Sequence, residues 1–137
     1  MKKYLLDTNI CIHFLKNEYK IVEKMAEVGF EHCYISELTL AELLFGLEYG
    51  SPERKERNLQ NYHKLMEAFG DNIVPIRVCF EVYAIQKASL KRVGQTIGEF
   101  DMLIGCSALV KEMTLVTRNT KHLERIEGLL LENWVDA

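Results

Sequence analysis

Residues 4–15 read YLLDTNICIHFL, an apolar run that stops at a carboxylate, Asp7, and then continues with helical spacing. The residues before Asp7 predict a short buried strand, and those after it predict a helix. The chain therefore ends its first strand on a negative charge, with Thr8 and Asn9 directly behind it. Ligands of parallel α/β sheets bind outside the carboxyl ends of the strands, so an acid at this place is a candidate for function.

The rest of the chain repeats the pattern of a short strand followed by a helix. Further β-forming runs lie at 33–36, 73–76 and 114–117, and longer stretches of helical periodicity separate them. This alternation predicts an α/β fold with a parallel sheet between helices. Because no Gly/Ser-rich linker or repeat interrupts the sequence, we expect a single domain over residues 1–137.

Two predicted helices, at 53–69 and 80–93, are amphipathic. The apolar positions of each helix are expected to pack in the core. These are Leu59, Tyr62, Met66 and Phe69 in the first helix, and Tyr83, Leu90 and Val93 in the second.

Composition excludes several classes of protein. The chain is 48% hydrophobic and 27% charged, which is ordinary for a globular domain. A net charge of −3 argues against a surface that binds nucleic acid everywhere, so an anionic partner would need a local patch. The N-terminus lacks the apolar segment of a signal peptide, and the most apolar run, LTLAELLFGL, is too short to span a bilayer. We expect a cytoplasmic protein without membrane contact.

The cysteines give no sign of a metal or disulfide framework. They are widely spaced, without the Cys/His spacing of a zinc site, and are expected to be buried thiols: Cys11, Cys33, Cys79 and Cys106.

Two further acids stand in strongly apolar helices. Only Thr39, Glu42 and Gly46 interrupt LTLAELLFGL, and their spacing places them on one face of an otherwise buried helix. Asp101 repeats the arrangement in IGEFDMLIGCSALV, where Gly105 follows it by one turn as Gly46 follows Glu42. We expect each glycine to leave space beside its acid.

Each acid also has a structural explanation. Asp7 could cap the next helix, Asp101 could favour a helix dipole from the first turn, and Glu42 could be half exposed. Together at one sheet edge, however, three carboxylates would repel one another, which implies a cation. Oxygen ligands without a Cys or His cluster favour Mg²⁺ or Mn²⁺, and such a site predicts metal-assisted phosphodiester hydrolysis. Thr8 and Thr117 could orient the ligating carboxylates, or serve only as capping or strand-end hydroxyls.

Four segments of the chain resemble the motif blocks of one known family. They read LLDTNICIHFLK, ISELTLAELLFG, IGEFDMLI and LVTRNTKHLERIEGLLLENW, and they span essentially the whole chain. In order and spacing they are similar to PIN-domain ribonucleases, specifically the VapC-type toxins of bacterial toxin–antitoxin pairs. The resemblance implies a three-layer α/β/α PIN-like domain with a mainly parallel central sheet, whose acids Asp7, Glu42 and Asp101 bind Mg²⁺ or Mn²⁺ and cut RNA.

The fourth motif position departs from the wider PIN pattern. Many PIN domains carry an aspartate where this chain has Asn119, an uncharged catalytic residue whose oxygen could hold a water of the metal but adds less to a second metal site. Glu99 is near Asp101 but matches no motif position. Basic residues flank the last motif and are candidates for contact with RNA phosphates: Arg118, Lys121, His122 and Arg125. His122 taken alone is more typical of a surface side chain than of a general base.

The resemblance also implies partners and products. Relatives form homodimers and are silenced by a VapB-type antitoxin, and hydrolysis by water would leave 5′-phosphate and 3′-hydroxyl ends on an RNA substrate, possibly tRNA, thereby inhibiting translation. One alternative is a catalytically inactive PIN-like module that binds RNA or a partner. Another is a signalling receiver domain, which would need paired acids after the first strand, where this chain has only Asp7.

Overall fold

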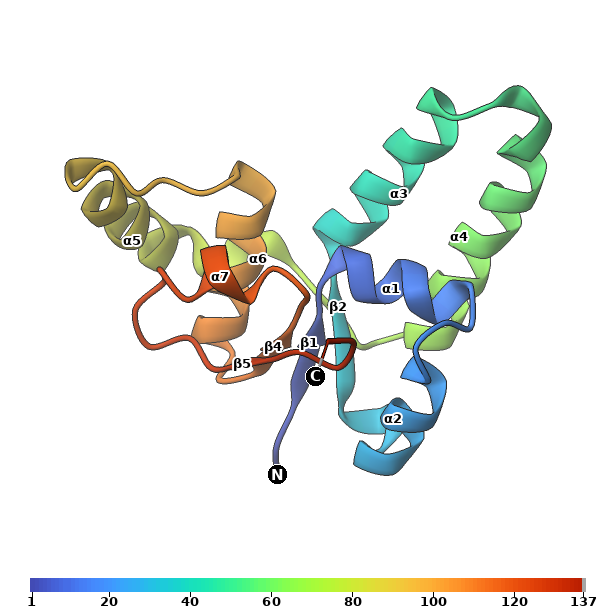
Figure 1. Cartoon of the computed structure of the whole chain (residues 1–137), viewed down its shortest axis with the longest axis horizontal. Coiled ribbons are helices and arrows are strands. Elements are labelled where there is room, and N and C mark those ends of the chain that lie inside the picture. The colour runs from blue at the N-terminus through green and yellow to red at the C-terminus, as the bar shows by residue number, and fades with distance from the viewer. Residues whose placement is uncertain (137) are drawn as a thin grey trace.

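A five-stranded parallel sheet forms the centre of the protein in a computed structural model, which describes residues 1–136. The strands are β1 (Tyr4–Leu6), β2 (Cys33–Ser36), β3 (Ile73–Val74), β4 (Thr114–Val116) and β5 (Leu131–Glu132), arranged in the order β3-β2-β1-β4-β5 (Figure 1). In the register of the sheet, Tyr4 of β1 lies between Cys33 of β2 and Thr114 of β4. The predicted parallel α/β sheet is confirmed, and β1 is its central strand.

Helices cover both faces of the sheet. They are α1 (Thr8–Leu15), α2 (Ile21–Val28), α3 (Glu37–Tyr49), α4 (Lys55–Phe69), α5 (Phe80–Arg92), α6 (Glu99–Val110) and α7 (Thr120–Leu123). Figure 1 shows α1 to α4 on one side of the sheet and α5 to α7 on the other. The strands alternate between two cores accordingly: Leu5 packs into the core of α5 and α6, whereas Tyr4 and Leu6 pack into that of α1, α2 and α4. This is the expected three-layer α/β/α architecture.

The α3–α4 pair extends beyond the sheet (Figure 1), so α3 is more exposed than the sequence suggested. Only Thr39 and Leu47 of this helix are buried. Phe45 is 68% and Tyr49 82% exposed, and their rings stack with centroids 5.5 Å apart. The prediction of an otherwise buried helix around Glu42 is therefore wrong, because an apolar face of α3 projects past the sheet edge and has no element of the described chain to pack against.

The predicted core faces of α4 and α5 are correct only in part. Phe69 and Leu90 are buried, but Met66 and Val93 are exposed, and α4 buries Leu65 instead. The reason is that α4 packs both against α3 and on the core, where Leu65 and Phe69 are its buried side chains, so that the neighbouring Met66 faces outward. Leu59, Tyr62 and Tyr83 are half-buried.

Smaller differences also have local causes. The strand expected at 73–76 ends at Val74, because Pro75 cannot donate a backbone hydrogen bond and a 3₁₀ turn, Ile76–Cys79, begins directly after it. Strand β5 was not expected. The four cysteines are buried free thiols, as predicted. Within residues 1–136, the helices are all too short or too polar to cross a bilayer.

Candidate active site

Asp7 lies at the carboxyl end of the central strand and is only 3% exposed. Its Oδ1 accepts a hydrogen bond from the Thr8 amide (2.8 Å), which caps the N-terminus of α1. Its Oδ2 accepts one from the Thr117 hydroxyl at the end of neighbouring β4 (2.7 Å). The capping role foreseen as a structural explanation is therefore real. The helix cap uses only Oδ1. The buried Oδ2 is held in place separately, by the Thr117 hydroxyl.

Glu42 is joined to the same sheet edge through Thr8. The Thr8 hydroxyl donates to Glu42 Oε1 at 2.6 Å and lies 2.9 Å from the hydroxyl of Thr39. Since Thr8 has a single hydroxyl proton and uses it on the carboxylate, Thr39 donates the other bond. The predicted polar stripe on α3 thus faces α1, with Thr39 fully buried and Glu42 half-buried.

Asp101, in the first turn of α6, is held from the loop after β4. Its Oδ2 accepts a hydrogen bond from Asn119 Nδ2 (3.0 Å), while Asn119 Oδ1 lies 2.7 Å from His122 Nδ1. If this amide were flipped, its oxygen would face the carboxylate oxygen of Asp101 without a proton between them. Asp101 therefore fixes the orientation of the Asn119 amide. In this orientation Asn119 Oδ1 is an acceptor, so His122 Nδ1 must carry the proton of the bond between them. From the sequence, the Asn119 oxygen is expected to hold a water of the metal; this oxygen already accepts one hydrogen bond, from His122, and has a second lone pair.

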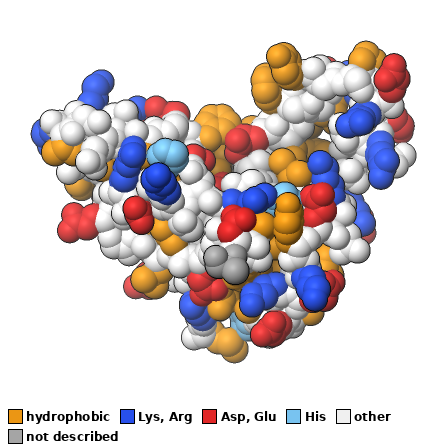
Figure 2. Space-filling view, viewed as in Figure 1, with side chains coloured by type: hydrophobic (Ala, Val, Ile, Leu, Met, Phe, Trp, Pro, Cys, Tyr) orange, Lys and Arg blue, Asp and Glu red, His pale blue; other side chains and the backbone are white. Residues whose placement is uncertain are grey.

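Thr117 joins the two halves of this site. Its hydroxyl oxygen donates to Asp7 and accepts from the Asn119 backbone amide (3.0 Å). The hydrogen bonds expected of Thr8 and Thr117 toward carboxylates are therefore present. In the space-filling view, the surface is hollowed between the two groups of helices, and an acidic side chain is visible in the hollow (Figure 2).

The electrostatics of the site favour a bound cation. Burial raises the pKa of Asp7 and that of Glu42, the bonds from Thr117 and Thr8 oppose the rise, and repulsion from Asp101 adds to it. Among residues 1–136, no lysine, arginine or histidine forms an ion pair with any of these acids. The negative charge is therefore uncompensated by the described chain itself.

The donor set fits Mg²⁺ or Mn²⁺. Asn9, which the sequence analysis did not select, has its Oδ1 buried without a hydrogen-bond partner in the described chain; its position two residues after Asp7 was the available signal. No three acidic, His or Cys side chains of residues 1–136 close around a point as a complete metal cage. Mg²⁺ keeps several of its waters and takes only one or two carboxylates directly, so an open arrangement of oxygens suits it.

Other candidate residues are engaged elsewhere. Glu99 bonds to Lys87 (2.6 Å) and to Tyr83, so its charge is compensated by a lysine. Arg118 pairs with Asp136 at 3.1 Å, and Arg125 donates to a backbone carbonyl. Lys121 and His122 are exposed near the end of β4.

The two glycines that follow the acids have different roles. A Cβ on Gly46 would meet nothing within 4 Å, so this residue leaves open space beside Glu42 as predicted. A Cβ on Gly105 would lie 2.5 Å from Ile126 Cδ1. The prediction for Gly105 is wrong, because this glycine lets the buried Ile126 side chain approach α6 rather than opening space beside Asp101.

The family model of the PIN domain matches residues 4–129 of the chain. The chain belongs to the PIN-domain family. This PIN domain is 31% identical to the tRNA(fMet)-specific endonuclease VapC of Shigella flexneri, over 98% of its own length and 99% of that protein. It is 32% identical to ribonuclease VapC2 of Rickettsia felis, over 96% and 97% of the two chains. The resemblance to VapC-type PIN domains is confirmed, and the receiver-domain alternative is excluded.

Solved structures agree with this assignment. The PIN domain superposes on a chain of the DNA-bound VapBC complex of Salmonella typhimurium with a TM-score of 0.84 and 31% identity, covering 98% of its own length and 99% of that chain. The residues matched by the family model include Asp7, Glu42, Asp101 and Asn119.

Proposed function

We propose that this VapC-type PIN domain is a Mg²⁺- or Mn²⁺-dependent endoribonuclease, the toxin of a toxin–antitoxin pair that inhibits translation by cutting RNA, with tRNA as the first candidate substrate. One observation carries the proposal. Asp7, Glu42 and Asp101 come from three separate segments, Asp101 repels both of the other two carboxylates, and none of the three forms an ion pair with a lysine, arginine or histidine among residues 1–136.

Each residue of the site has a task in this proposal. Asp7, Glu42 and Asp101 would hold the divalent ion, which supplies charge neutralisation at the phosphate and an acidified water as the nucleophile. Thr117 and Thr8 fix the rotamers of Asp7 and Glu42 by donating to them at 2.7 and 2.6 Å. Asn119 fixes Asp101 without adding charge.

The burial of Asp7 has a chemical consequence. A carboxylate that is removed from water interacts more strongly with a cation than an exposed one does. An ionised Asp7 therefore lowers the free energy of unfolding of the metal-free protein, and binding of the ion raises it again. Water rather than the 2′-hydroxyl would attack the phosphorus, which leaves 5′-phosphate and 3′-hydroxyl ends.

A protein partner is part of the proposal. Several similar solved structures are VapBC complexes, so we infer a VapB-type antitoxin for this chain. We also infer a homodimer, since Leu44, Phe45 and Tyr49 of α3 leave an apolar face uncovered by the described chain.

An RNA cleavage assay tests the proposal. Purified protein is treated with EDTA, restored with Mg²⁺ or Mn²⁺, and incubated with total RNA, beside the Asp7→Asn variant. We expect cleavage only by the wild type and only with the metal. RNA binding without cleavage under every condition would favour the alternative of an inactive PIN-like binding module.

A further inference from the structure

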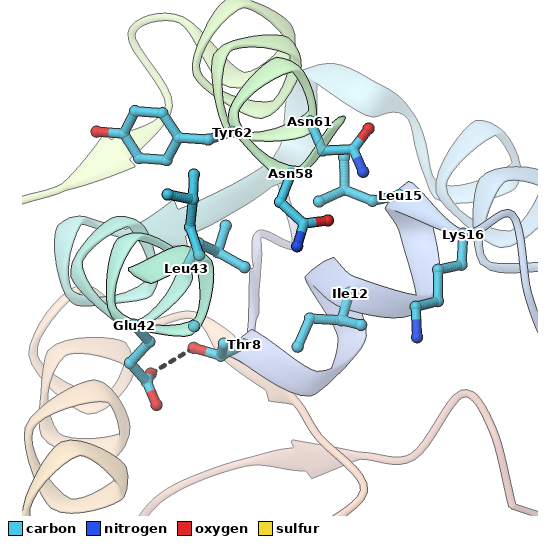
Figure 3. A pocket seen from close by; sticks show the side chains of 11 residues that line it. Thr8, Ile12, Leu15, Lys16, Glu42, Leu43, Asn58, Asn61 and Tyr62 are labelled. Atoms are coloured by element: carbon cyan, nitrogen blue, oxygen red, sulfur yellow. Dashed lines mark hydrogen bonds between the residues drawn. The ribbon is translucent and has the colours of Figure 1, made fainter. Parts of the chain in front are cut away.

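A cavity of about 350 Å³ opens beside Glu42, between α1, α3 and α4. Its wall on one side is formed by Thr8 and Glu42, the same pair that contributes to the acidic site (Figure 3). Gly46 contributes to the wall one turn after Glu42 and leaves that side open. The cavity and the acidic site are therefore neighbours that share two side chains.

The lining combines apolar surface with two carboxamide groups. Ile12, Leu15 and Leu43 supply apolar surface. Asn58 and Asn61 of α4 are half-buried, and both line the cavity. Figure 3 shows the Asn58 side chain pointing from α4 toward Ile12 and Thr8, across the space between the helices.

This combination matches the chemistry of a nucleobase. A carboxamide presents a donor and an acceptor together, as the edge of a base does, and apolar side chains accept the faces of a base. Lys16, at the rim, is exposed and forms no ion pair within the described chain. It is placed to contact a phosphate next to a bound base.

We propose that this cavity binds one unpaired base of the RNA substrate, close to the bond that is cut, and that Asn58 and Asn61 select which base enters. The inference rests on the proposed ribonuclease function and adds to it the origin of sequence preference. The volume is within the range of small-ligand pockets, about 300–1,000 Å³. Thr8 and Glu42 belong both to the cavity wall and to the acidic site, where the phosphodiester that is cut would be positioned. A base attached to that phosphodiester would therefore lie next to the cavity, which favours a base over a peptide segment as the occupant.

Gly46→Leu is the most direct variant for a test. Gly46 is part of the cavity wall and a Cβ there meets nothing within 4 Å, so a longer side chain can be introduced at this point of the wall, and leucine favours the helix. The substrate is a single-stranded oligoribonucleotide that contains a site cut in total RNA, together with copies in which one base at a time near that site is abasic. The readout is kcat/KM for each copy.

For the wild type, one abasic position should lower kcat/KM by about tenfold or more, as expected for loss of a bound base. Gly46→Leu should cut the intact RNA more slowly and should lose no further activity at that abasic position, because the two changes remove the same contact. Asn58→Ala and Asn61→Ala should alter the preferred base. Gln60→Ala, an exposed amide of the same helix outside the cavity, is the matched control and should alter nothing.

The outcomes separate this inference from the proposed function. Cleavage of intact RNA by the wild type with a metal supports the ribonuclease function, and its absence overturns both proposals. If wild type and Gly46→Leu respond equally to every abasic position, the base-binding cavity is refuted while the ribonuclease stands. The same holds if Gly46→Leu cuts RNA normally but loses a VapB-type partner, since the cavity would then belong to a protein contact.

Discussion

Replacing Asp7 by asparagine separates the charge of this side chain from its shape. Asparagine caps helices as well as aspartate does, so the bond to the Thr8 amide at 2.8 Å is retained. The Thr117 hydroxyl loses a charged acceptor, but the new amide can donate to it instead. Since burial raises the pKa of Asp7 in spite of both bonds, the fold disfavours the ionised form. Asp7→Asn should therefore leave the free energy of unfolding without metal unchanged or raise it, and its melting temperature in EDTA should be equal to or higher than that of the wild type.

The same variant should lose its response to metal. A ligand that binds only the folded state stabilises it by about 1.4 kcal/mol at ten times its Kd, or about 4 °C in melting temperature for a chain of this length. Thermal melts in EDTA and across a Mn²⁺ series should show this rise in the wild type and little rise in Asp7→Asn.

Asp71→Asn is the matched control, because it makes the same change at an exposed aspartate outside the site. It should melt and respond to Mn²⁺ as the wild type does. Equal metal-induced shifts in the wild type and in Asp7→Asn would refute the reasoning, since Asp7 would then be a helix cap only.

Further predictions concern the surroundings of the acids. Thr117→Val removes the hydroxyl that bonds the acid after β1 and should lower kcat/KM for RNA by about 10–100-fold while the chain stays folded by circular dichroism; unchanged kinetics would exclude a positioning role. Asn119→Ala should reduce cleavage without unfolding the chain, and full activity in this variant would show that the amide has no share in catalysis. Burial raises the pKa of Glu42 above its ordinary value of 4.5, so the folded metal-free state binds more protons than the unfolded one just above pH 4.5, and its stability should fall as pH rises through that window. In the same window protons compete with the metal, so calorimetry should find a weaker Mn²⁺ affinity at lower pH, and a pH-independent Kd would contradict this. Gly105→Ala places a methyl 2.5 Å from a buried isoleucine side chain and should cost about 1–3 kcal/mol, whereas Gly46→Ala should be neutral or stabilising by up to about 1 kcal/mol; chemical denaturation measures both.

The central strands and the acids could be predicted because they have strong local signals. Buried parallel strands are short apolar runs, and an acid at the end of such a run, like Asp7, is conspicuous. Glu42 and Asp101 were recognisable as charges in helices that are otherwise apolar. A carboxylate-orienting role for Thr117 could be suggested from its place at a strand end, but the structure was needed to show that its partner is Asp7.

Other features depend on contacts that a local pattern does not contain. Strand β5 has only two residues, Leu131 and Glu132, and exists because β4 offers it a partner. The spacing of α4 could not show that Leu65 rather than Met66 faces the core. The orientation of Asn119 is set by Asp101 and His122 together, and the cavity at Asn58 requires three helices in place.

The central claim is that Asp7 serves RNA cleavage through a metal site at the end of β1. Mapping of 5′-phosphate RNA ends across cells that produce either the wild type or Asp7→Asn, each without an antitoxin, tests it most directly. The account predicts discrete new 5′-phosphate ends in the wild type at positions that share a base preference, and none of them with Asp7→Asn at equal protein levels. The same ends in both samples would contradict it.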